Sequence, residues 1–453
     1  METLHTLFYF TIAIAVLVAF HELGHFWVAR KTGVKVLRFS IGFGKTLWTY
    51  QKSPEQTEFV VSAVPLGGYV KMVDEREGEV KPEDLPYAFN RQSVAVRTAI
   101  VAAGPIFNLV LAVLLFWLVF VIGETGVKPI LGDIDAGTLA AEAGFAAGDE
   151  ILSVEDTPTP TWTMALDELM SRALDGKREI LITVTADGSQ HTRFLQFSDD
   201  EIKSPEQFYK QLGFKPWSPI IKPVIGKLFE GGVAEQAGLR SGDLIVSADG
   251  VNIDSWQQWV DYVQARPEVA IQLRIERDDV RMPLTITPRR EDQPDGKVVG
   301  KIGAGVETPK DLLDAMLVEY SLGPVEAIPA ALSKTWFYSV STLKMMGKMF
   351  VGQASVDNLS GPISIAQYAG QSAEMGLAAF LKFLALVSVS LGVLNLLPVP
   401  VLDGGHLVFF AIEAIKGSPI SERAQLYFQQ VGMFLLMCLM VLALFLDLDR
   451  LFP

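Results

Sequence analysis

The sequence predicts a multi-span α-helical membrane protein with a large folded block inserted between its second and third spans. Half of the 453 residues are hydrophobic and the mean hydropathy is +0.31, which is more apolar than a soluble chain of this length. The long apolar runs lie toward the two ends, whereas residues 126–308 are polar and strand-rich. We therefore expect four transmembrane helices, a membrane-associated β-hairpin and two inserted domains of mixed β/α structure.

Charge and cysteine content narrow the classes of function. The net charge of −14 disfavours nucleic acid as a partner. Cys438 is the only cysteine in the sequence, so no intrachain disulfide can form. The cysteine content therefore does not indicate whether the chain lies in an oxidising or a reducing compartment. The first 20 residues contain no Lys or Arg, and we therefore interpret the first apolar run as a retained span and not as a cleaved signal peptide.

Residues 1–30 are the first predicted transmembrane helix, and this helix carries the motif H-E-L-G-H at 21–25. His21 and His25 are four positions apart, so both imidazoles leave the same face of a helix. That geometry suits two ligands of one Zn²⁺, with Glu22 as a general base. The motif alone is weak, but ionisable residues inside a span usually mark function. The alternative is a histidine pair at the membrane interface.

Basic residues predict the orientation of this helix. Five of them follow the span: Arg30, Lys31, Lys35, Arg38 and Lys45. By the positive-inside rule this end faces the cytoplasm. The H-E-L-G-H motif then lies toward the cytoplasmic side, while both termini and the inserted block lie outside. For a bacterial chain this means the inner membrane, with the inserted domains in the periplasm and the bilayer as a partner.

Residues 31–97 are predicted to be a β-rich region on the cytoplasmic side. Within it, residues 58–72 are strongly apolar and have turn signals at Pro65 and at Gly67-Gly68, so we expect a hairpin. One interpretation is a small cytoplasmic sheet. The other is a hairpin that re-enters the membrane beside the metal, where protein or a wet cavity would cover its backbone.

The second predicted transmembrane helix covers residues 98–124 and contains Asn108 in an otherwise apolar run. A buried asparagine in a span needs a hydrogen-bond partner. Asn108 could either form a hydrogen bond between two helices or support the metal site, and the sequence is compatible with both roles.

The inserted block contains a repeat, which defines a first domain at 125–215 and a second at 216–308. Residues 127–130 (V-K-P-I) reappear 94 residues later as 221–224 (I-K-P-V), and the same offset joins Ala143-Gly144 to Ala237-Gly238 and Gly148-Asp149 to Gly242-Asp243. An ungapped match at glycine and aspartate positions indicates duplication.

The repeat unit resembles a PDZ domain of the bacterial protease type, most clearly at 237–245 (A-G-L-R-S-G-D-L-I). Such a domain accepts an extended chain along a sheet edge, so the expected partners are peptide tails or periplasmic regulators. The first copy departs from the second, because it lacks an Asp-Gly pair at the position of Asp249-Gly250. We therefore expect ligand binding mainly from the second copy. A purely structural duplication is the alternative.

The C-terminal third returns to the membrane. Residues 309–374 are predicted to be amphipathic, interfacial helices. Residues 375–410 and 426–447 are the third and fourth transmembrane helices. The third ends in N-L-L-P-V-P-V-L-D-G-G-H (395–406). Its prolines and glycines interrupt the helix and leave backbone groups without helical hydrogen bonds at membrane depth. Such an interruption is tolerated in a membrane where the backbone lines a functional site. A hydrolytic zinc site needs a third ligand. Asp403 and His406 both qualify, and Asp403 could instead be a turn residue.

Taken together, H-E-L-G-H, the 395–406 segment and the PDZ copies resemble the site-2 protease family, and the duplication is typical of its regulator of sigma-E protease group. The resemblance covers essentially the whole chain. It implies an intramembrane endopeptidase with one Zn²⁺ per chain. The implied substrate is a single-span membrane protein already trimmed outside the membrane, such as an anti-sigma factor in an envelope stress response or a signal-peptide remnant. The tandem PDZ domains would act as a size filter.

The resemblance also implies roles for individual residues. Asp403 would be the third ligand beside His21 and His25, and Glu22 the general base. Apart from the resemblance, His406 and Asn108 are candidates for a supporting role beside the ligands. The substrate backbone would be held by Asn395 and by the strand residues Gly67, Gly68, Tyr69 and Val70.

Two other functions fit parts of the sequence. A non-catalytic PDZ membrane adaptor with a structural metal site would explain the repeats, but Glu22 beside the histidine pair argues against it. A metal or ion transporter would use the broken third span, but it leaves the repeats without a role.

Overall fold

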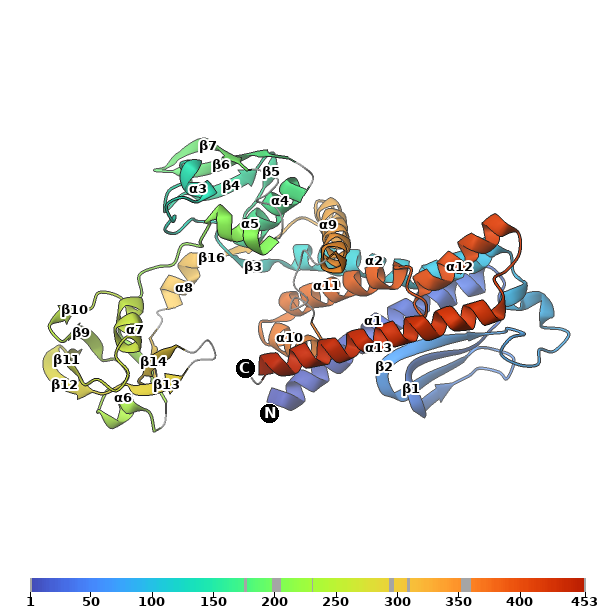
Figure 1. The fold of residues 1–453 in the computed structure, drawn as a ribbon, viewed down its shortest axis with the longest axis horizontal. Helices are drawn as coiled ribbons and strands as arrows, with labels where there is room; N and C mark the ends of the chain where they lie inside the picture. The colour runs from blue at the N-terminus through green and yellow to red at the C-terminus, as the bar shows by residue number, and fades with distance from the viewer. Residues whose placement is uncertain are drawn as a thin grey trace. The chain divides into compact units, whose positions relative to one another are not determined.

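The computed structural model describes residues 2–174, 177–197, 205–229, 231–292, 297–307, 310–351 and 360–451. The chain forms two compact units (Figure 1). The helical unit consists of Met1–Glu124 and Tyr320–Phe452, and the insert consists of Thr125–Glu319. The insert therefore interrupts the helical unit after its second long helix, as the sequence predicts.

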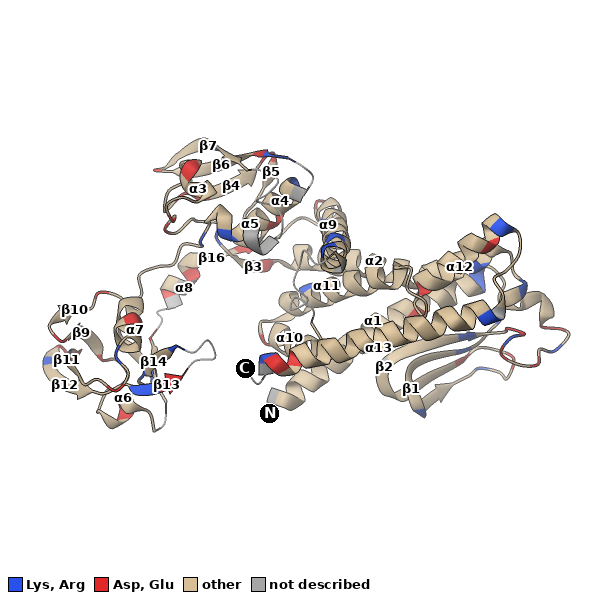
Figure 2. Cartoon of the chain, in the orientation of Figure 1, with Lys and Arg blue, Asp and Glu red and all other residues tan. Residues whose placement is uncertain are grey.

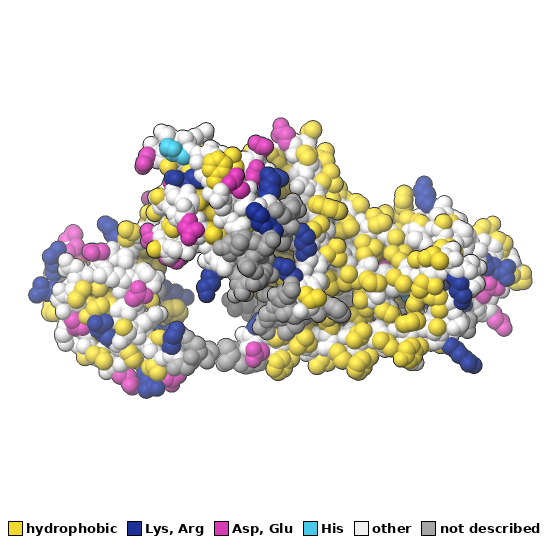
Figure 3. Space-filling model, turned by 45° about the horizontal axis from the view of Figure 1, so that its top comes forward, with side chains coloured by type: hydrophobic (Ala, Val, Ile, Leu, Met, Phe, Trp, Pro, Cys, Tyr) yellow, Lys and Arg dark blue, Asp and Glu magenta, His cyan; other side chains and the backbone are white. Residues whose placement is uncertain are grey.

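Four helices of the described residues are long and apolar enough to cross a membrane, which agrees with the predicted number of spans. They are α1 (Glu2–Lys31), α2 (Val94–Ile122), α11 (Leu377–Leu396) and α13 (Glu422–Leu451). Figure 2 shows these helices free of charge over most of their length. Figure 3 shows hydrophobic side chains over much of the visible surface of the helical unit, as expected of a surface that faces lipid.

The helical unit is built around α2, which packs against α1 and α11. Ser93 caps its first turn by accepting a hydrogen bond from the backbone N–H of Val96. The core between the helices includes Leu17 of α1, Phe116 of α2 and Val389 of α11, all with at most 1% of their surface exposed. The site described below lies beside the N-terminal half of α2.

Helix α9 (Ala327–Phe350) crosses the long helices. Figure 1 views it nearly along its axis, while α2 and α11 run across the page. It buries Ala327 and Ala331 in the core and exposes Leu332 and Trp336 on the adjoining face. This distribution suits the predicted interfacial helix.

The predicted helical region 309–374 is only partly helical. It contains α8 (Lys310–Met316), α9 and α10 (Pro362–Glu374), and residues 352–359 lie outside the described part. Leu317–Tyr320 is the strand β16, which pairs with β3 (Glu124–Val127). The helical prediction was wrong here because a partner 190 or more residues away in sequence decides the conformation. The chain thus enters and leaves the insert as two adjacent strands.

The predicted third transmembrane element, 375–410, is two helices and not one. Helix α11 ends at Leu396, and α12 (Asp403–Lys416) begins seven residues later. Pro398 and Pro400 cannot donate a backbone hydrogen bond, and Val401 has a φ of 92°, so the helix cannot continue. This break places Asp403 in the first turn of α12.

A small sheet packs against α1, and it corrects the predicted hairpin at 58–72. Its strands are β1 (Val36–Tyr50) and β2 (Glu58–Met72), and both are bent. Residues 38–41 lie between 58–61 on one side and 68–71 on the other, and residues 46–50 pair with 59–62. The two halves of β2 are therefore not paired with each other, and Gly67 and Gly68 lie at a bend of β2. Residues 68–72 form one edge of the sheet and 46–50 the other.

A loop with two short 3-10 helices, η1 (Leu85–Tyr87) and η2 (Phe89–Arg91), joins this sheet to α2. The loop is held by ion pairs, among them the one from Arg91 to Glu75. Hydrogen bonds from Arg91 and Asn90 hold the pKa of Glu75 at about 2.

The insert contains two similar domains, which we describe separately. In the first, a four-stranded sheet has the order β5-β4-β6-β7. Its elements are α3 (Leu139–Glu142), β4 (Glu150–Val154), β5 (Thr157–Pro158), α4 (Trp162–Leu174), β6 (Glu179–Ala186), β7 (Ser189–Gln196) and α5 (Pro205–Leu212).

The second domain repeats the sheet in the order β10-β9-β11-β12 and adds the pairs β13-β14 and β15-β8. Its elements are β8 (Ile225–Leu228), α6 (Val233–Gln236), β9 (Leu244–Ala248), β10 (Val251–Asn252), α7 (Trp256–Gln264), β11 (Ile271–Arg277), β12 (Val280–Ile286), β13 (Arg289–Asp292), β14 (Val298–Lys301) and β15 (Ala304–Val306). The repeated order supports the duplication inferred from the sequence, while the PDZ assignment stays a prediction.

The repeated Gly-Asp motif has a structural role in both domains. Asp149 pairs with Arg193 in the first, and Asp243 pairs with Arg277 in the second. Burial alone would raise the pKa of Asp243, but the hydrogen bonds from Arg277 and from the backbone N–H of Arg240 outweigh it and lower the pKa.

Candidate metal centre

Helix α1 presents its histidines toward α2 because the two helices approach closely. A Cβ atom on Gly24 would overlap the carbonyl oxygen of Ala103, so only glycine fits there. One residue further, Nδ1 of His25 lies 2.9 Å from the carbonyl oxygen of Ile100 and donates to it. With its proton on Nδ1, His25 has a free lone pair on Nε2.

Two residues of α2 shape the space around the imidazoles. A Cβ atom on Gly104 would overlap Nε2 of His25 and lie 2.8 Å from Cε1 of His21. One turn later, Nδ2 of the buried Asn108 lies 3.3 Å from Nδ1 of His21. Asn108 therefore contacts the side chain of a candidate ligand, which is compatible with the supporting role, one of the two roles that the sequence left open.

Asp403 reaches the two histidines from α12. Its Oδ2 atom lies 3.2 Å from Nε2 of His21 and 3.7 Å from Nε2 of His25, and the two Nε2 atoms are 3.2 Å apart. Ligand atoms about 2.0–2.1 Å from a tetrahedral zinc ion are separated by roughly 3.3 Å. The three donors therefore have the chemistry and the spacing of three ligands of one zinc ion.

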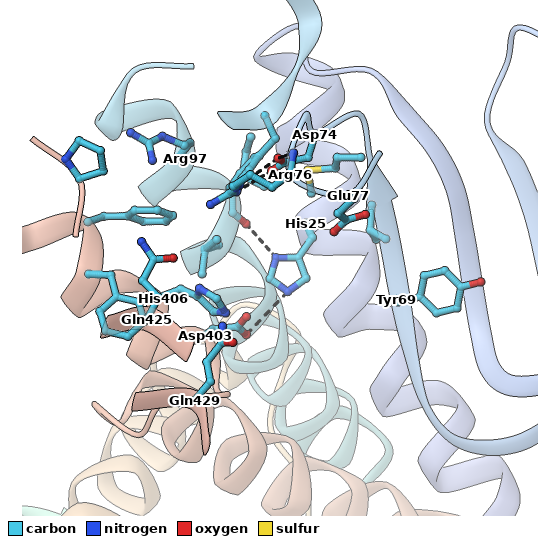
Figure 4. Close-up of a pocket in the computed structure, with 18 of the residues that line it drawn as sticks. His25, Tyr69, Asp74, Arg76, Glu77, Arg97, Asp403, His406, Gln425 and Gln429 are labelled. Atoms are coloured by element: carbon cyan, nitrogen blue, oxygen red, sulfur yellow. Dashed lines mark hydrogen bonds and ion pairs between the residues drawn. The ribbon is translucent and has the colours of Figure 1, made fainter. Parts of the chain in front are cut away.

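The three donors and Glu22 line a cavity of about 670 Å³. Figure 4 shows His25 facing Asp403 across this cavity, with Arg97 and Asp74 nearby and Tyr69 on the strand beside it. Only 8% of the surface of Glu22 is exposed. A carboxylate beside the ligands, in a cavity large enough for water, can take a proton from water and return it.

The edge strand of the small sheet forms one wall of the cavity. Gly68, Tyr69 and Val70 are among the lining residues. A Cβ atom on Gly68 would lie 2.9 Å from Cγ of Glu22, so the strand backbone touches the proposed base. Gly67 does not line the cavity; it has a φ of 139° and packs against the ring of Phe43, which makes it a bend residue.

The structure places the remaining predicted residues differently. His406 lines the cavity, but among the described residues only His21, His25 and Asp403 bring ligand atoms within 4.8 Å of one another. The alternative of His406 as the third ligand is therefore disfavoured. Asn395 lies at the C-terminal end of α11 and is not among the described residues that line the cavity.

Sequence reasoning missed a charged pair in the cavity wall. Arg97 of α2 binds Glu413 of α12, and Phe410 lies beneath the guanidinium. Arg97 falls one residue before the start of the predicted span, so it was not recognised as part of the helix. A charge in the first turn of an apolar helix is a signal that could have identified it.

Comparisons with known proteins agree with this site. The profile of peptidase family M50 matches residues 9–439. Regulator of sigma-E protease RseP of Escherichia coli is 44% identical over 452 residues, which cover 98% of each chain. RseP of Salmonella typhimurium is 43% identical over 98% of each chain. A relative from Neisseria meningitidis, 46% identical over 99% of this chain and all of its own, has a name that assigns it provisionally to the zinc metalloproteases. The chain therefore belongs to peptidase family M50, the site-2 protease family of zinc metalloproteases.

Proposed function

We propose that the chain is an intramembrane endopeptidase of a bacterial inner membrane. Its substrate would be a single-span membrane protein already trimmed outside the membrane, such as an anti-sigma factor or a signal-peptide remnant. The observation that carries the proposal is the convergence of His21, His25 and Asp403 on a cavity formed by apolar helices and bordered by a sheet edge. The relatives named for sigma-E regulation support the substrate class.

Each of the cavity residues has a separate role in the proposed hydrolysis. When bound, zinc supplies a Lewis acid, which polarises the scissile carbonyl and acidifies water. His21, His25 and Asp403 would hold it, and Ile100 and Asn108 would orient the two imidazoles. Glu22 accepts the proton of the attacking water and delivers it to the leaving amine.

A transmembrane helix hides its peptide bonds in its own hydrogen bonds, so it must be unwound before hydrolysis. The edge formed by residues 68–72 offers an unpaired row of backbone groups to an unwound segment. This edge adjoins Glu22, so a paired substrate strand would lie within reach of the base. Asn395 would hold the substrate backbone after a movement of the neighbouring break. The small sheet is thus the proposed substrate platform.

The second domain of the insert offers a groove for a peptide tail or a periplasmic regulator. A cavity of about 430 Å³ lies between α7 and residues 300–304, and its wall includes Trp256, Trp259, Val260, Val263 and Ile302. An apolar groove beside a glycine-containing loop suits a chain end with a hydrophobic last residue. We propose that the insert lies in the periplasm and filters substrates by the size of their outer part, with the metal centre toward the cytoplasm.

Replacement of Glu22 by glutamine tests the proposed reaction. Glutamine keeps the shape of the side chain but cannot accept a proton, so cleavage is expected to fall by about 10²–10⁴-fold. The measurement is cleavage of a tagged single-span protein by the purified chain in detergent, with zinc content determined in the same sample. Zinc is expected to stay at one per chain. Cleavage at the wild-type rate would refute the proposal, and the adaptor function would then be favoured.

A proline at Val70 tests the substrate platform. Proline removes one backbone N–H from the edge strand beside Glu22, so cleavage is expected to fall several-fold while zinc stays bound. Thr49→Pro is the matched control, because it makes the same change at the far edge of the sheet. Equal cleavage rates for the two variants would contradict pairing of the substrate with residues 68–72.

A further inference from the structure

The third ligand is positioned less directly than the two histidines. His21 and His25 belong to α1, which is locked onto α2 by the close contact at Gly24 and by the hydrogen bond to Ile100. Asp403 instead follows the break between α11 and α12. The backbone hydrogen bonds within that break are local, from Val399 to Leu397 and from Leu402 to Val399. The placement of α12 on its neighbours, α2 among them, therefore contributes to where the Asp403 carboxylate lies.

A two-pronged ion pair fastens α12 to α2. Nη2 of Arg97 donates to Oε1 of Glu413 at 2.6 Å, and Nη1 donates to Oε2 at 3.1 Å. Nε of the same arginine donates to the carbonyl oxygen of Gln92 at 3.1 Å, and the guanidinium carbon lies 5.0 Å from the ring centre of Phe410. Every nitrogen of the guanidinium has a partner, so the side chain is fixed in one orientation.

The pair is well placed to act on the site. The side chains of Arg97 and Glu413 are only 10% and 14% exposed, so water screens their attraction weakly. Arg97 lies three residues before Ile100 on α2, so the residue that holds α12 and the residue that orients His25 are on the same face of one helix. Asp403 and Glu413 belong to the same helix, α12, so a displacement of this helix at Glu413 would also displace Asp403.

We propose that Arg97 and Glu413 are positioning residues of the zinc site, which hold Asp403 within reach of His21 and His25 by fixing α12 on α2. The inference rests on Asp403 as the third ligand. It assigns to the pair no contact with substrate and no proton transfer.

The test measures zinc affinity, by competition with a chelator of known affinity, in the purified full-length chain. Arg97→Gln and Glu413→Gln are each expected to weaken zinc binding by about 10- to 100-fold, the range found when a group that orients a ligand is removed. In the same samples kcat is expected to fall, while KM is expected to change little, because the pair lies outside the substrate platform. The reversed pair, Arg97→Glu with Glu413→Arg, is expected to recover part of the lost affinity.

A combination with Asp403→Ala separates this inference from the assignment of the ligand. If the pair acts through Asp403, Arg97→Gln weakens zinc binding no further once Asp403 is replaced. Additive losses would overturn the inference while leaving the ligand intact. If Asp403→Ala alone keeps wild-type zinc affinity, the ligand assignment itself fails.

Lys382→Gln is the matched control. Lys382 of α11 binds Glu124, the first residue of β3, just after α2 ends, and their side chains are 27% and 13% exposed. The Lys382→Gln variant loses a comparable, partly buried ion pair of the helical unit that does not involve α12, so zinc affinity is expected to stay unchanged. If Arg97→Gln likewise lowers only the unfolding temperature, the pair is merely structural and the inference is wrong. Glu413→Asp, which keeps the charge on a shorter arm and is easier to fold, is expected to give an intermediate zinc affinity, and a wild-type value would count against the inference.

Discussion

Gly104→Ala is expected to abolish both zinc binding and proteolysis. The added methyl group would overlap Nε2 of His25, the atom that faces Asp403, and would lie 2.8 Å from Cε1 of His21, so it would clash with both rings. Because Gly104 lies inside α2 and both histidines lie inside α1, neither backbone can yield without separating two packed helices. The ligand set would be displaced as a whole, so the expected loss exceeds that of Glu22→Gln.

The measurement is zinc content of the purified variant together with cleavage of a tagged single-span protein. Gly347→Ala is the matched control. This glycine also lies inside a helix, α9, but a Cβ atom there meets nothing within 4 Å. Alanine favours a helix over glycine by about 1 kcal/mol, so the control is expected to be active and at least as stable. Full zinc occupancy in Gly104→Ala would contradict the packing of α1 on α2.

Asp447→Ala is expected to cause the largest loss of stability. Asp447 of α13 is 1% exposed, and its carboxylate accepts hydrogen bonds from the backbone N–H groups of Gly361, Ile363 and Ser364 and from the Ser364 hydroxyl. It therefore caps the N-terminus of α10 from another helix. Alanine would leave several buried donors without a partner, at a cost of about 3 kcal/mol or more.

The unfolding midpoint in detergent measures this effect, and Asp449→Ala is the control because Asp449 is exposed on the same helix. Asp447→Asn keeps one acceptor oxygen and should lie between the two. A midpoint for Asp447→Ala equal to that of Asp449→Ala would show that the cap contributes nothing. Since α13 also contributes Gln425 and Gln429 to the wall of the cavity, a loosened α13 is expected to reduce activity as well.

The sequence predicts those parts of the fold that local pattern decides. Four apolar runs give four helices, and the spacing of His21 and His25 places both imidazoles on one face of α1. The repeat gives two domains with the same strand order. Asp403 and His406 could not be separated by sequence alone, because the break before α12 decides which of them faces α1.

The features that were missed depend on distant partners. Residues 58–72 have the turn signals of a hairpin, yet both halves of β2 pair with β1, so the glycines make a bend. Arg97 and Glu413 are 316 residues apart, and the Asp447 cap bridges 84 residues to Ile363. No local pattern encodes such pairs, because packing of whole helices brings them together.

The strands β3 and β16 have a consequence for how such a chain can change over evolution. They pair with each other at the point where the insert begins and ends. Neighbouring strands lie about 4.8 Å apart, so the two cut ends of the helical unit could be rejoined by a very short turn. A module attached in this way can be gained, duplicated or lost as a single genetic event without a change in the core of its host. The metal centre and the insert proposed to filter its substrates can therefore diversify independently.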